Sequence, residues 1–377
     1  YRKYQSKKVS VDENVFIKET KISTQNAFGK ILDQYAKNNT DFSQRILTTS
    51  PDVSVSTNLG PWINRKGLFS RKDSSDTFKD RKIPSAQKWI FSSQGQHIEL
   101  GIAEMNLFLM LGAAGLSHEF FGERLFPIGT VYDPFISRGL DAMNYACYQD
   151  ARFMIVGTPS GISLAPEGGA HQSIGTPLIG ISQPGLLSFE PAFADELALI
   201  MNYGFNYLQD EAGGSIYLRL TTRSIDQPMR EIDNELKNNI IKGGYWLKKP
   251  GPNPEVIIVY QGAVAIEAIE STALLGEKFK DLGVLSITSS DKLFHEWKKQ
   301  NGTSHIELLL ECVPRDTRII TVIDGHPMTL SWIGSINGHK TIPLGVNSFG
   351  QTGKVDDLFK EFEIDSQSIS KLGSTIN

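Results

Sequence analysis

The stretch RLFPIGTVYDPFISRGLDAMNYACYQDARFMIVGTPSG, residues 124–161, contains two apolar runs separated by a segment of helical composition. The runs, at 124–133 and 151–161, end in Asp, Gly, Pro or Ser, which commonly bound strands. The segment between them, 136–149, can form a helix that returns the chain to the same end of a sheet. The sequence therefore predicts two parallel strands joined by a crossover helix.

The same alternation continues on both sides of this unit. Continuous apolar runs of this kind are typical of parallel strands covered by helices on both faces. Near the start of the pattern, Ser23 or Thr24 is expected to cap a helix whose apolar residues recur at helical spacing. Further strands are predicted at 45–52 and 214–222, and further helices at 99–118 and 191–209.

A polar, basic segment interrupted by Gly and Pro divides the chain at 237–254. Beyond it the alternation of strands and helices restarts, and a last helix is predicted at 355–362. We therefore predict an α/β fold with two doubly wound domains. The predicted parts are an arm at 1–20, a first domain at 21–236, a linker at 237–254, a second domain at 255–377 and, within the first domain, a long surface excursion at 53–97.

Composition excludes several classes of protein. The 377 residues exceed the size at which a single core stops growing, and a net charge of −4 offers no basic field for nucleic acid. Two distant cysteines, Cys147 and Cys312, favour a reducing compartment. The longest apolar run is too short to span a bilayer. We expect no nucleic acid or membrane partner, and a cytoplasmic location, or the mitochondrial matrix in a eukaryote.

Glu104 is the first candidate for chemistry. It lies in GIAEMNLFLMLGAAG, residues 101–115, where apolar neighbours leave almost no polar face. Burial there would penalise the charged form, so such a carboxylate is expected to hold its proton and share it with a ligand nitrogen. The alternative is a Glu that faces solvent on an amphipathic helix.

Phe135 and Arg138 follow the strand that ends near Asp133-Pro134. Ligands of open α/β sheets bind beyond the carboxyl ends of strands, so Phe135 is a candidate stacking face for a flat ring and Arg138 a candidate anion contact. Alternatively, Phe135 belongs to the core and Arg138 pairs with Asp141.

His171 lies in APEGGAHQSIGTP, residues 165–177, a loop shaped by Gly and Pro. It is a candidate acid, base or hydrogen-bond donor, or else a solvated loop residue. The histidines and cysteines show no metal-ligand spacing, Cys147 is expected to pack rather than react, and Asp324-Gly325-His326 is interpreted as a turn.

Several motifs taken together resemble the thiamine diphosphate enzymes of the transketolase and 2-oxo acid dehydrogenase superfamily. HIELGIAEMN, VYDPFISRGLD, APEGGAHQS, SFEPAFADELALIM and SIYLRLTTR resemble, in this order, the pyrimidine-binding domain of those enzymes. The homodimeric decarboxylating component of pyruvate dehydrogenase is the most similar group. GVLSITSSDKLFHEW and VNSFGQTGKVDDLFKEFEID resemble the carboxyl-terminal domain of the same proteins.

The resemblance assigns roles to five residues. Glu104 would hydrogen-bond a ring nitrogen of the cofactor's aminopyrimidine, and Phe135 would stack on that ring. Tyr132 and Arg138 would line the same pocket, and His171 would face the substrate. Catalysis is thereby implied for Glu104 and His171, and cofactor binding for Glu104, Tyr132, Phe135 and Arg138.

The resemblance also implies reaction and partners. Such an enzyme decarboxylates pyruvate and passes the two-carbon fragment to the lipoyl domain of an acyltransferase. The family's Gly-Asp-Gly motif for diphosphate and Mg²⁺ is absent, since the chain contains no Gly-Asp dipeptide. We therefore expect no metal ligand here, and an incomplete, inactive chain that is either the second half of a larger enzyme or a β-type subunit. Alternative functions are transketolase-type transfer between sugar phosphates and a non-catalytic assembly module.

Overall fold

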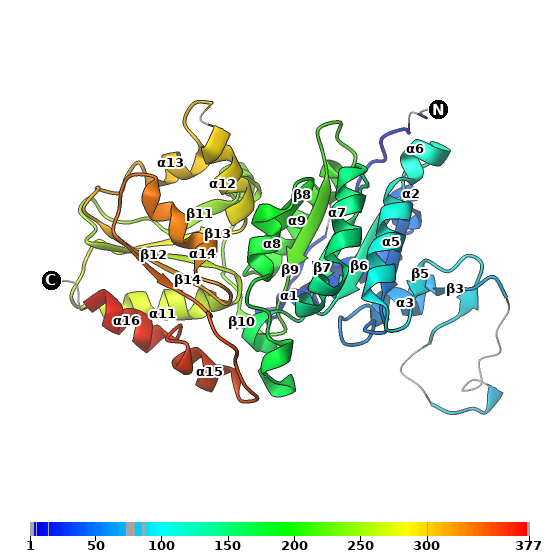
Figure 1. Cartoon of the computed structure of the whole chain (residues 1–377), viewed down its shortest axis with the longest axis horizontal. Coiled ribbons are helices and arrows are strands. Elements are labelled where there is room, and N and C mark those ends of the chain that lie inside the picture. The colour runs from blue at the N-terminus through cyan, green and yellow to red at the C-terminus, as the bar shows by residue number, and fades with distance from the viewer. Residues whose placement is uncertain are drawn as a thin grey trace.

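The computed structural model describes residues 4, 6–13, 15–72, 80–84, 88–299 and 301–374. It consists of two α/β modules that lie side by side, the first built around a broad sheet and the second around a smaller one (Figure 1). A short antiparallel pair, β1 (Lys21–Ile22) with β10 (Ile225–Asp226), lies near their junction. The predicted class, two doubly wound α/β modules, is confirmed.

In the described part of the chain, the sheet of the first module has eight strands in the order β4-β3-β5-β2-β6-β7-β9-β8, all paired in parallel. Strand β6 is buried at every position, which explains why it reads as a continuous apolar run. The strands are β2 (Ile46–Ser50), β3 (Leu68–Phe69), β4 (Phe91–Ser92), β5 (His97–Glu99), β6 (Phe126–Val131), β7 (Met154–Gly157), β8 (Leu186–Phe189) and β9 (Ser215–Arg219).

Helices cover both faces of this sheet. One face packs against α1, α3 and α9, and the other against α5 and α7, where Cys147 is part of the core as expected. Ser23 caps α1, because the amide of Asn26 donates to its hydroxyl at 3.1 Å. The helices are α1 (Thr24–Asn38), α2 (Asp41–Gln44), α3 (Gly60–Lys66), α5 (Glu104–Gly115), α6 (Ser117–Phe121), α7 (Leu140–Tyr148), α8 (Thr176–Ser182) and α9 (Ala194–Tyr207).

The strand order changes direction between β2 and β6. Strand β5 adds on one side of β2, whereas β6, β7 and β9 add on the other. The carboxyl ends of strands at such a point leave a crevice between the connections, and ligands of open α/β sheets bind there. The segments that follow β5 and β6 leave the sheet at this point and are therefore the first candidates for ligand contact.

The second module has a mixed sheet, in the order β11-β13-β12-β14-β15. Only its edge strand β11 is antiparallel to its neighbour among the described pairs. Helices α11, α15 and α16 cover one face, and α12, α13 and α14 the other. The elements are β11 (Gly244–Lys248), β12 (Val256–Gln261), α11 (Ala265–Leu275), β13 (Gly283–Ile287), α12 (Ser290–Lys299), α13 (His305–Leu310), β14 (Arg318–Ile323), α14 (Met328–Ser331), β15 (Thr341–Leu344), α15 (Val355–Glu361) and α16 (Ser366–Ser374).

Two expectations about local structure were wrong, and the surface excursion expected at 53–97 holds some regular structure. The segment 237–254 is not an irregular linker, because it holds most of helix α10 (Asn234–Lys242) and all of β11. The surface excursion at 53–97 contains α3 and three short strands at the edge of the sheet, with residues 73–79 and 85–87 outside the described part. The helix at 355–362 is not the last, since α16 follows it.

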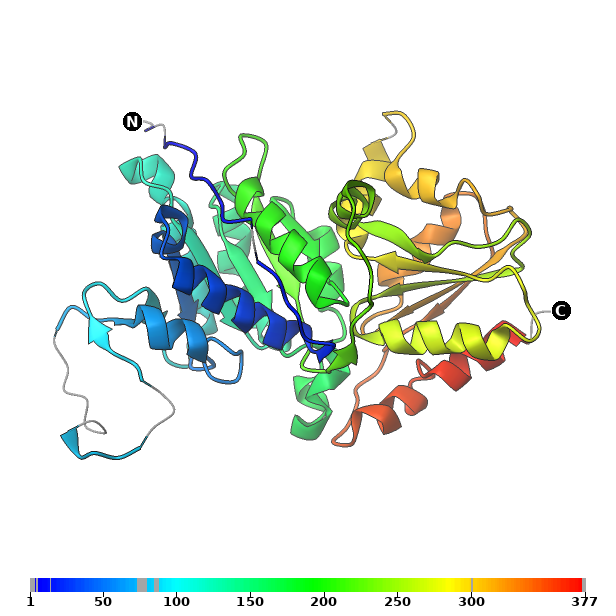
Figure 2. The same ribbon diagram turned by 180° about the vertical axis from the view of Figure 1, so that it is seen from behind.

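The described part of the arm at 1–20 lies along the first module, between α1 and α9 (Figure 2). Val11 and Val15 are buried there, and the Gln209 side chain bonds to both backbone groups of Val9. In the ranges that the structure describes, no helix is both long and apolar enough to cross a membrane.

Candidate functional site

Glu104 is the first residue of α5 and is buried. Its carboxylate forms an ion pair with the Arg138 guanidinium. The apolar surroundings expected for Glu104 are only partly present, because Ile102 and Met105 beside it are exposed. The cost of burying this carboxylate is therefore offset by a cation and by the N-terminal end of its own helix, and the apolar enclosure expected from the sequence is incomplete.

Phe135 lies on η1 (Asp133–Gly139), the 3-10 helix that follows β6, and Tyr132 directly precedes this helix. Phe135 stacks on Tyr132 with a centroid separation of 5.9 Å and an interplanar angle of 14°. The Arg138 guanidinium carbon lies 3.8 Å from the centroid of the Phe135 ring. Arg138 thus pairs with Glu104 and covers Phe135, in place of the pair with Asp141 that the sequence left open.

His171 ends η3 (Gly169–His171) and meets Phe135 edge to face, with ring centroids 5.5 Å apart. It is partly buried, in contrast to the solvated loop residue considered as the alternative. The structure therefore brings together all five residues selected from the sequence. Phe135 is at the centre, in contact with Tyr132, Arg138 and His171, and Arg138 connects it to Glu104.

A buried polar cluster lies directly beneath these residues. We call it the Arg219 cluster, and it comprises Asp133, Ser173, Thr176, Glu190 and Arg219. Arg219 Nε donates to Asp133 Oδ2 at 3.0 Å and another guanidinium nitrogen pairs with Glu190. Tyr217 donates its hydroxyl to Asp133. Opposite charges and hydrogen bonds compensate the desolvation of these groups.

Burial raises the pKa of two carboxyls around Arg219. Burial raises the pKa of Glu190 to about 7, although the Arg219 charge and a hydrogen bond from Gln261 lower it. Burial also raises the pKa of Asp324 to about 6, against the opposing effect of Arg219 and the amide of Ile162. Asp324 therefore does more than form the turn inferred from the sequence, because it accepts the Ile162 amide of the other module at 3.0 Å.

The second module also contacts the loop that carries His171. Gly169 has no room for a side chain, because a Cβ there would lie 2.0 Å from the carbonyl oxygen of Gly350. The Gln172 side-chain amide donates to the carbonyl of Gln351 at 3.1 Å. The backbone of one module thus packs directly on the candidate site of the other.

Comparison with known proteins identifies this arrangement. Residues 7–228, more than half of the chain, match the family model of the pyruvate dehydrogenase E1 component middle domain. The chain belongs to that family. Residues 243–365 match the transketolase-like carboxyl-terminal domain, which confirms the second half of the resemblance.

Relatives of this E1-family chain include both enzymes considered from the sequence. The pyruvate dehydrogenase E1 component of Escherichia coli (strain K12) is 24% identical over 366 residues, covering 92% of this chain and 40% of that protein. A transketolase structure from Leishmania mexicana superimposes with a TM-score of 0.74 at 16% identity, covering 95% of this chain and 46% of that one. This chain spans less than half the length of the curated relatives it matches.

One solved structure has the same extent as this E1-family chain. It is described as a split gene transketolase, inactive beta4 tetramer, and matches with a TM-score of 0.64 at 19% identity. The match covers 94% of this chain and 98% of that chain. At this identity the likeness establishes the fold alone.

Sequence reasoning missed the Arg219 cluster. An Arg within the apolar run SIYLRL was the available signal, because a cation on a buried strand requires buried anions. Asp133, at the end of the strand predicted at 124–133, supplies one of them. Their proximity could not be inferred, since residues 133, 190 and 219 are distant in sequence and meet only at the sheet.

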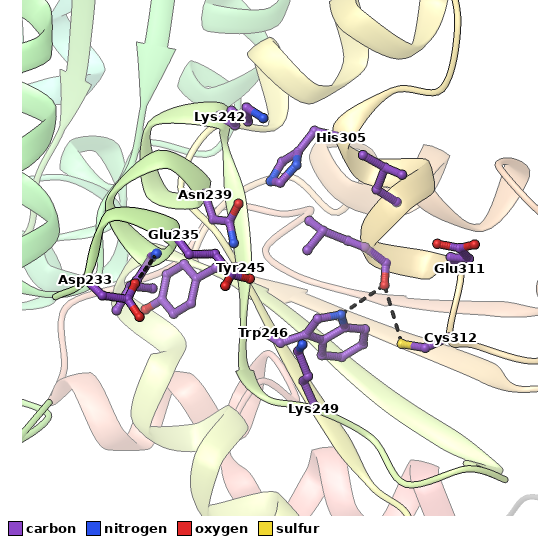
Figure 3. Close-up of a pocket in the computed structure, with 13 residues that line it drawn as sticks. Asp233, Glu235, Asn239, Lys242, Tyr245, Trp246, Lys249, His305, Glu311 and Cys312 are labelled. Carbon is purple, nitrogen blue, oxygen red and sulfur yellow. Dashed lines mark hydrogen bonds between the residues drawn. The ribbon is translucent and has the colours of Figure 1, made fainter. Parts of the chain in front are cut away.

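A cavity of about 650 Å³ lies elsewhere in this E1-family chain, between α10, β11 and α13. Figure 3 shows Trp246, His305 and Cys312 around it, with Trp246 and Cys312 both donating to the carbonyl of Leu309. It contains none of the five candidate residues. Within the described residues, no group of His, Cys, Asp and Glu is placed to hold a metal ion.

Proposed function

We propose that this chain is the pyrimidine-binding and carboxyl-terminal part of a thiamine diphosphate-dependent pyruvate dehydrogenase E1 component. The complete enzyme would decarboxylate pyruvate and pass the acetyl group to a lipoyl domain. The match of residues 7–228 to the E1 middle domain supports this proposal. The convergence of Glu104, Phe135 and His171 supports it independently.

The single observation that carries the proposal is the placement of the Arg138 guanidinium. This flat, nitrogen-rich group both hydrogen-bonds the Glu104 carboxylate and lies over the Phe135 ring. An aminopyrimidine would make the same two contacts, one with an acid and one with an aromatic face. The residues therefore fit the pyrimidine, provided that Arg138, whose side chain is 52% exposed, moves aside.

Each residue then has a defined task. When bound, thiamine diphosphate supplies the carbanion chemistry that a protein lacks. Glu104 holds or exchanges a proton at a pyrimidine nitrogen, and Phe135 orients the ring by stacking. His171, at the edge of the Phe135 ring, is placed to donate a hydrogen bond to a 2-oxo acid.

The diphosphate and Mg²⁺ would be held by a part of the enzyme other than the described residues. Ile102, Met105 and Leu109 are apolar yet exposed around the first turns of α5, directly beside Glu104. Exposed apolar patches mark surfaces that another protein covers. We propose that the diphosphate-binding domain, in the same chain or in the partner of a homodimer, covers this surface and completes the site.

Replacement of Glu104 in the complete enzyme tests the proposal. Glu104→Ala is expected to lower kcat for pyruvate decarboxylation by about 10²-fold to 10⁴-fold, because proton transfer at the pyrimidine loses its acid. Glu119→Ala, in the middle of α6 and outside the candidate site, is the matched control and is expected to retain activity. Activity of Glu104→Ala within threefold of wild type, a difference of about 0.7 kcal/mol or less, would refute the assignment.

Transketolase-type transfer is the second candidate, favoured by a relative named transketolase 2, from Aliivibrio fischeri, that is 25% identical over 275 residues. Sugar-phosphate transfer requires cations that contact phosphate near the site. The complete enzyme can be assayed in parallel with pyruvate and with a ketose phosphate donor. Activity with the ketose phosphate alone would replace the E1 proposal, and inactivity with both, in an enzyme shown to bind the cofactor, would favour a non-catalytic assembly module.

A further inference from the structure

Arg219 occupies the centre of the buried polar cluster and uses several donors at once. Its Nε donates to Asp133 Oδ2 at 3.0 Å and to Thr176 Oγ1 at 3.2 Å. Its Nη2 donates to the carbonyl and hydroxyl of Ser173 at 3.3 and 3.2 Å, and its Nη1 pairs with Glu190. A single rigid guanidinium therefore fixes four other residues.

Two of these partners belong to the segments that carry the candidate site. Asp133 is the first residue of η1, the segment that places Phe135 and Arg138. Ser173 lies two residues after His171, and its hydroxyl donates to Asp133 while accepting the amide of Gly161 at 2.9 Å. The segment with the stacking ring and the loop with the histidine are thus held together at Arg219.

The opposite side of Arg219 faces the second module. Glu190 accepts a hydrogen bond from Gln261 Nε2, at the end of β12, at 2.9 Å. The Glu190 amide also donates to the carbonyl of Thr288 at 2.8 Å. The contacts of Arg219 therefore extend from η1 and the His171 loop to the sheet of the carboxyl-terminal module.

We propose that Arg219 is a positioning residue that sets the His171 loop against Phe135 and couples this geometry to the second module. The effect on catalysis rests on the proposed function, whereas the positioning itself does not. A lysine would retain the positive charge. It would lack the planar set of N–H donors with which Arg219 bonds to Asp133, Ser173 and Glu190 in fixed directions. Breaking these bonds would leave buried groups unsatisfied and allow the two segments to separate.

Arg223 supplies a matched control. It also joins the modules, donating to the carbonyl of Ala263 at 2.9 Å and pairing with Glu267. None of its hydrogen bonds involves Asp133 or Ser173. Arg223→Lys therefore weakens the module contact by the same chemical change without touching the Arg219 cluster.

The experiment uses this chain and requires no cofactor. The His171 ring proton resonance, assigned as the one lost in His171→Gln, reports the Phe135 ring current, and deuterium exchange reports 133–139 and 161–173. In Arg219→Lys, the resonance is expected to move toward its value in the unfolded chain. Exchange in both segments is expected to accelerate about tenfold, the effect of losing one charge-assisted hydrogen bond. Arg223→Lys is expected to change neither.

Ser173→Ala covers the case in which Arg219→Lys does not fold, since it removes only the hydroxyl between Asp133 and Gly161. It is expected to shift the His171 resonance in the same direction. An unchanged His171 resonance in a folded Arg219→Lys or Ser173→Ala chain would overturn the proposal, and so would an equal shift in Arg223→Lys. These outcomes are separate from those of Glu104→Ala, which tests the proposed function through turnover.

Discussion

Glu104 must be stabilised where it is buried and must also be able to bind a ligand. A buried carboxylate requires compensation, and the structure provides it through Arg138, which also covers the Phe135 ring. Because Arg138 is about half exposed, its pair with Glu104 is expected to contribute about 1 kcal/mol or less. A ligand can therefore displace Arg138 at small cost while Glu104 stays in place.

Glu190 gives the folded chain a specific dependence on pH. Burial raises its pKa from 4.5 to about 7, so the folded chain holds this proton more tightly than the unfolded chain. The resulting contribution to stability is complete below pH 4.5 and is lost as the pH rises through about 7. Relative to Glu190→Gln, the wild type is expected to lose on the order of 3 kcal/mol of unfolding free energy between these limits.

Urea unfolding of both chains at several pH values between 4.5 and 8 measures this difference. Comparison with Glu190→Gln cancels the other titrating groups to first order. Glu267→Gln, which loses a less buried carboxylate at the same module junction, serves as the control. A stability difference that stays constant with pH would contradict the assignment.

Helix α10 was not expected from the amino-acid composition of its segment. The segment 237–254 is polar and contains Gly and Pro. A helix nevertheless begins just before it and continues into it, capped by Asp233, whose side chain accepts the amide of Leu236 at 2.7 Å. Asp233→Ala is expected to lower the free energy of unfolding by about 1 kcal/mol, whereas Asp233→Asn is expected to stay within a few tenths. Thermal or urea unfolding measures both, and equal stability of the two variants would show that the cap contributes nothing.

The contact of α5 with η1 depends on a glycine. A Cβ at Gly139 would lie 2.1 Å from Phe108 Cδ2 and 3.2 Å from the Glu104 carbonyl oxygen. Gly139→Ala is therefore expected to force the two elements apart and to destabilise the chain by about 1–3 kcal/mol.

Gly175→Ala is the matched control, because nothing lies within 4 Å of its added Cβ. Its stability is expected to stay within about 0.5 kcal/mol of wild type. Urea unfolding of the two variants provides the measurement. If both alanine variants were equally stable, close packing between α5 and η1 would not be required.

At the scale of the whole molecule, one surface is left uncovered beside the candidate site. Leu109 on α5 is 58% exposed, and Tyr145 and Tyr148 are exposed on the neighbouring α7. Figure 1 shows these two helices on the same face of the first module. Leu109 also belongs to the exposed apolar surface described above with Ile102 and Met105. We propose that the diphosphate-binding domain, in the same chain or in the partner of a homodimer, covers this surface.

Leu109→Glu is expected to weaken that association about tenfold or more, because a buried charge would replace an apolar contact. Leu308→Glu is the matched control, since Leu308 is 52% exposed on α13 of the other module. Sedimentation velocity of this chain, alone and with the diphosphate-binding domain, measures the association. Equal association of both variants with wild type would place the partner on another surface.

The class of fold and most of the helices and strands could be predicted from the amino-acid sequence. Strands buried on both faces, such as β6 and β12, are mostly apolar along their length. They can therefore be recognised in the sequence as continuous apolar runs. The helix cap could be narrowed to Ser23 or Thr24 because the signal is local, and the structure assigns it to Ser23. The five site residues could be named because short motifs of the chain resemble those of thiamine diphosphate enzymes, and such a resemblance requires no knowledge of the fold.

Which side chains contact one another in the candidate site depends on the tertiary fold and could not be predicted. Edge strand β11 and helix α10 escaped prediction because their stability comes from tertiary packing rather than from local composition, β11 by pairing with β13 and α10 by packing on the core of the first module. The pairing of Glu104 with Arg138, and the gathering of Asp133, Glu190 and Arg219 around one buried guanidinium, join residues that are distant along the chain. Parallel strands bring such residues to one edge of the sheet, and the strand order, which no local pattern encodes, determines which ones meet there.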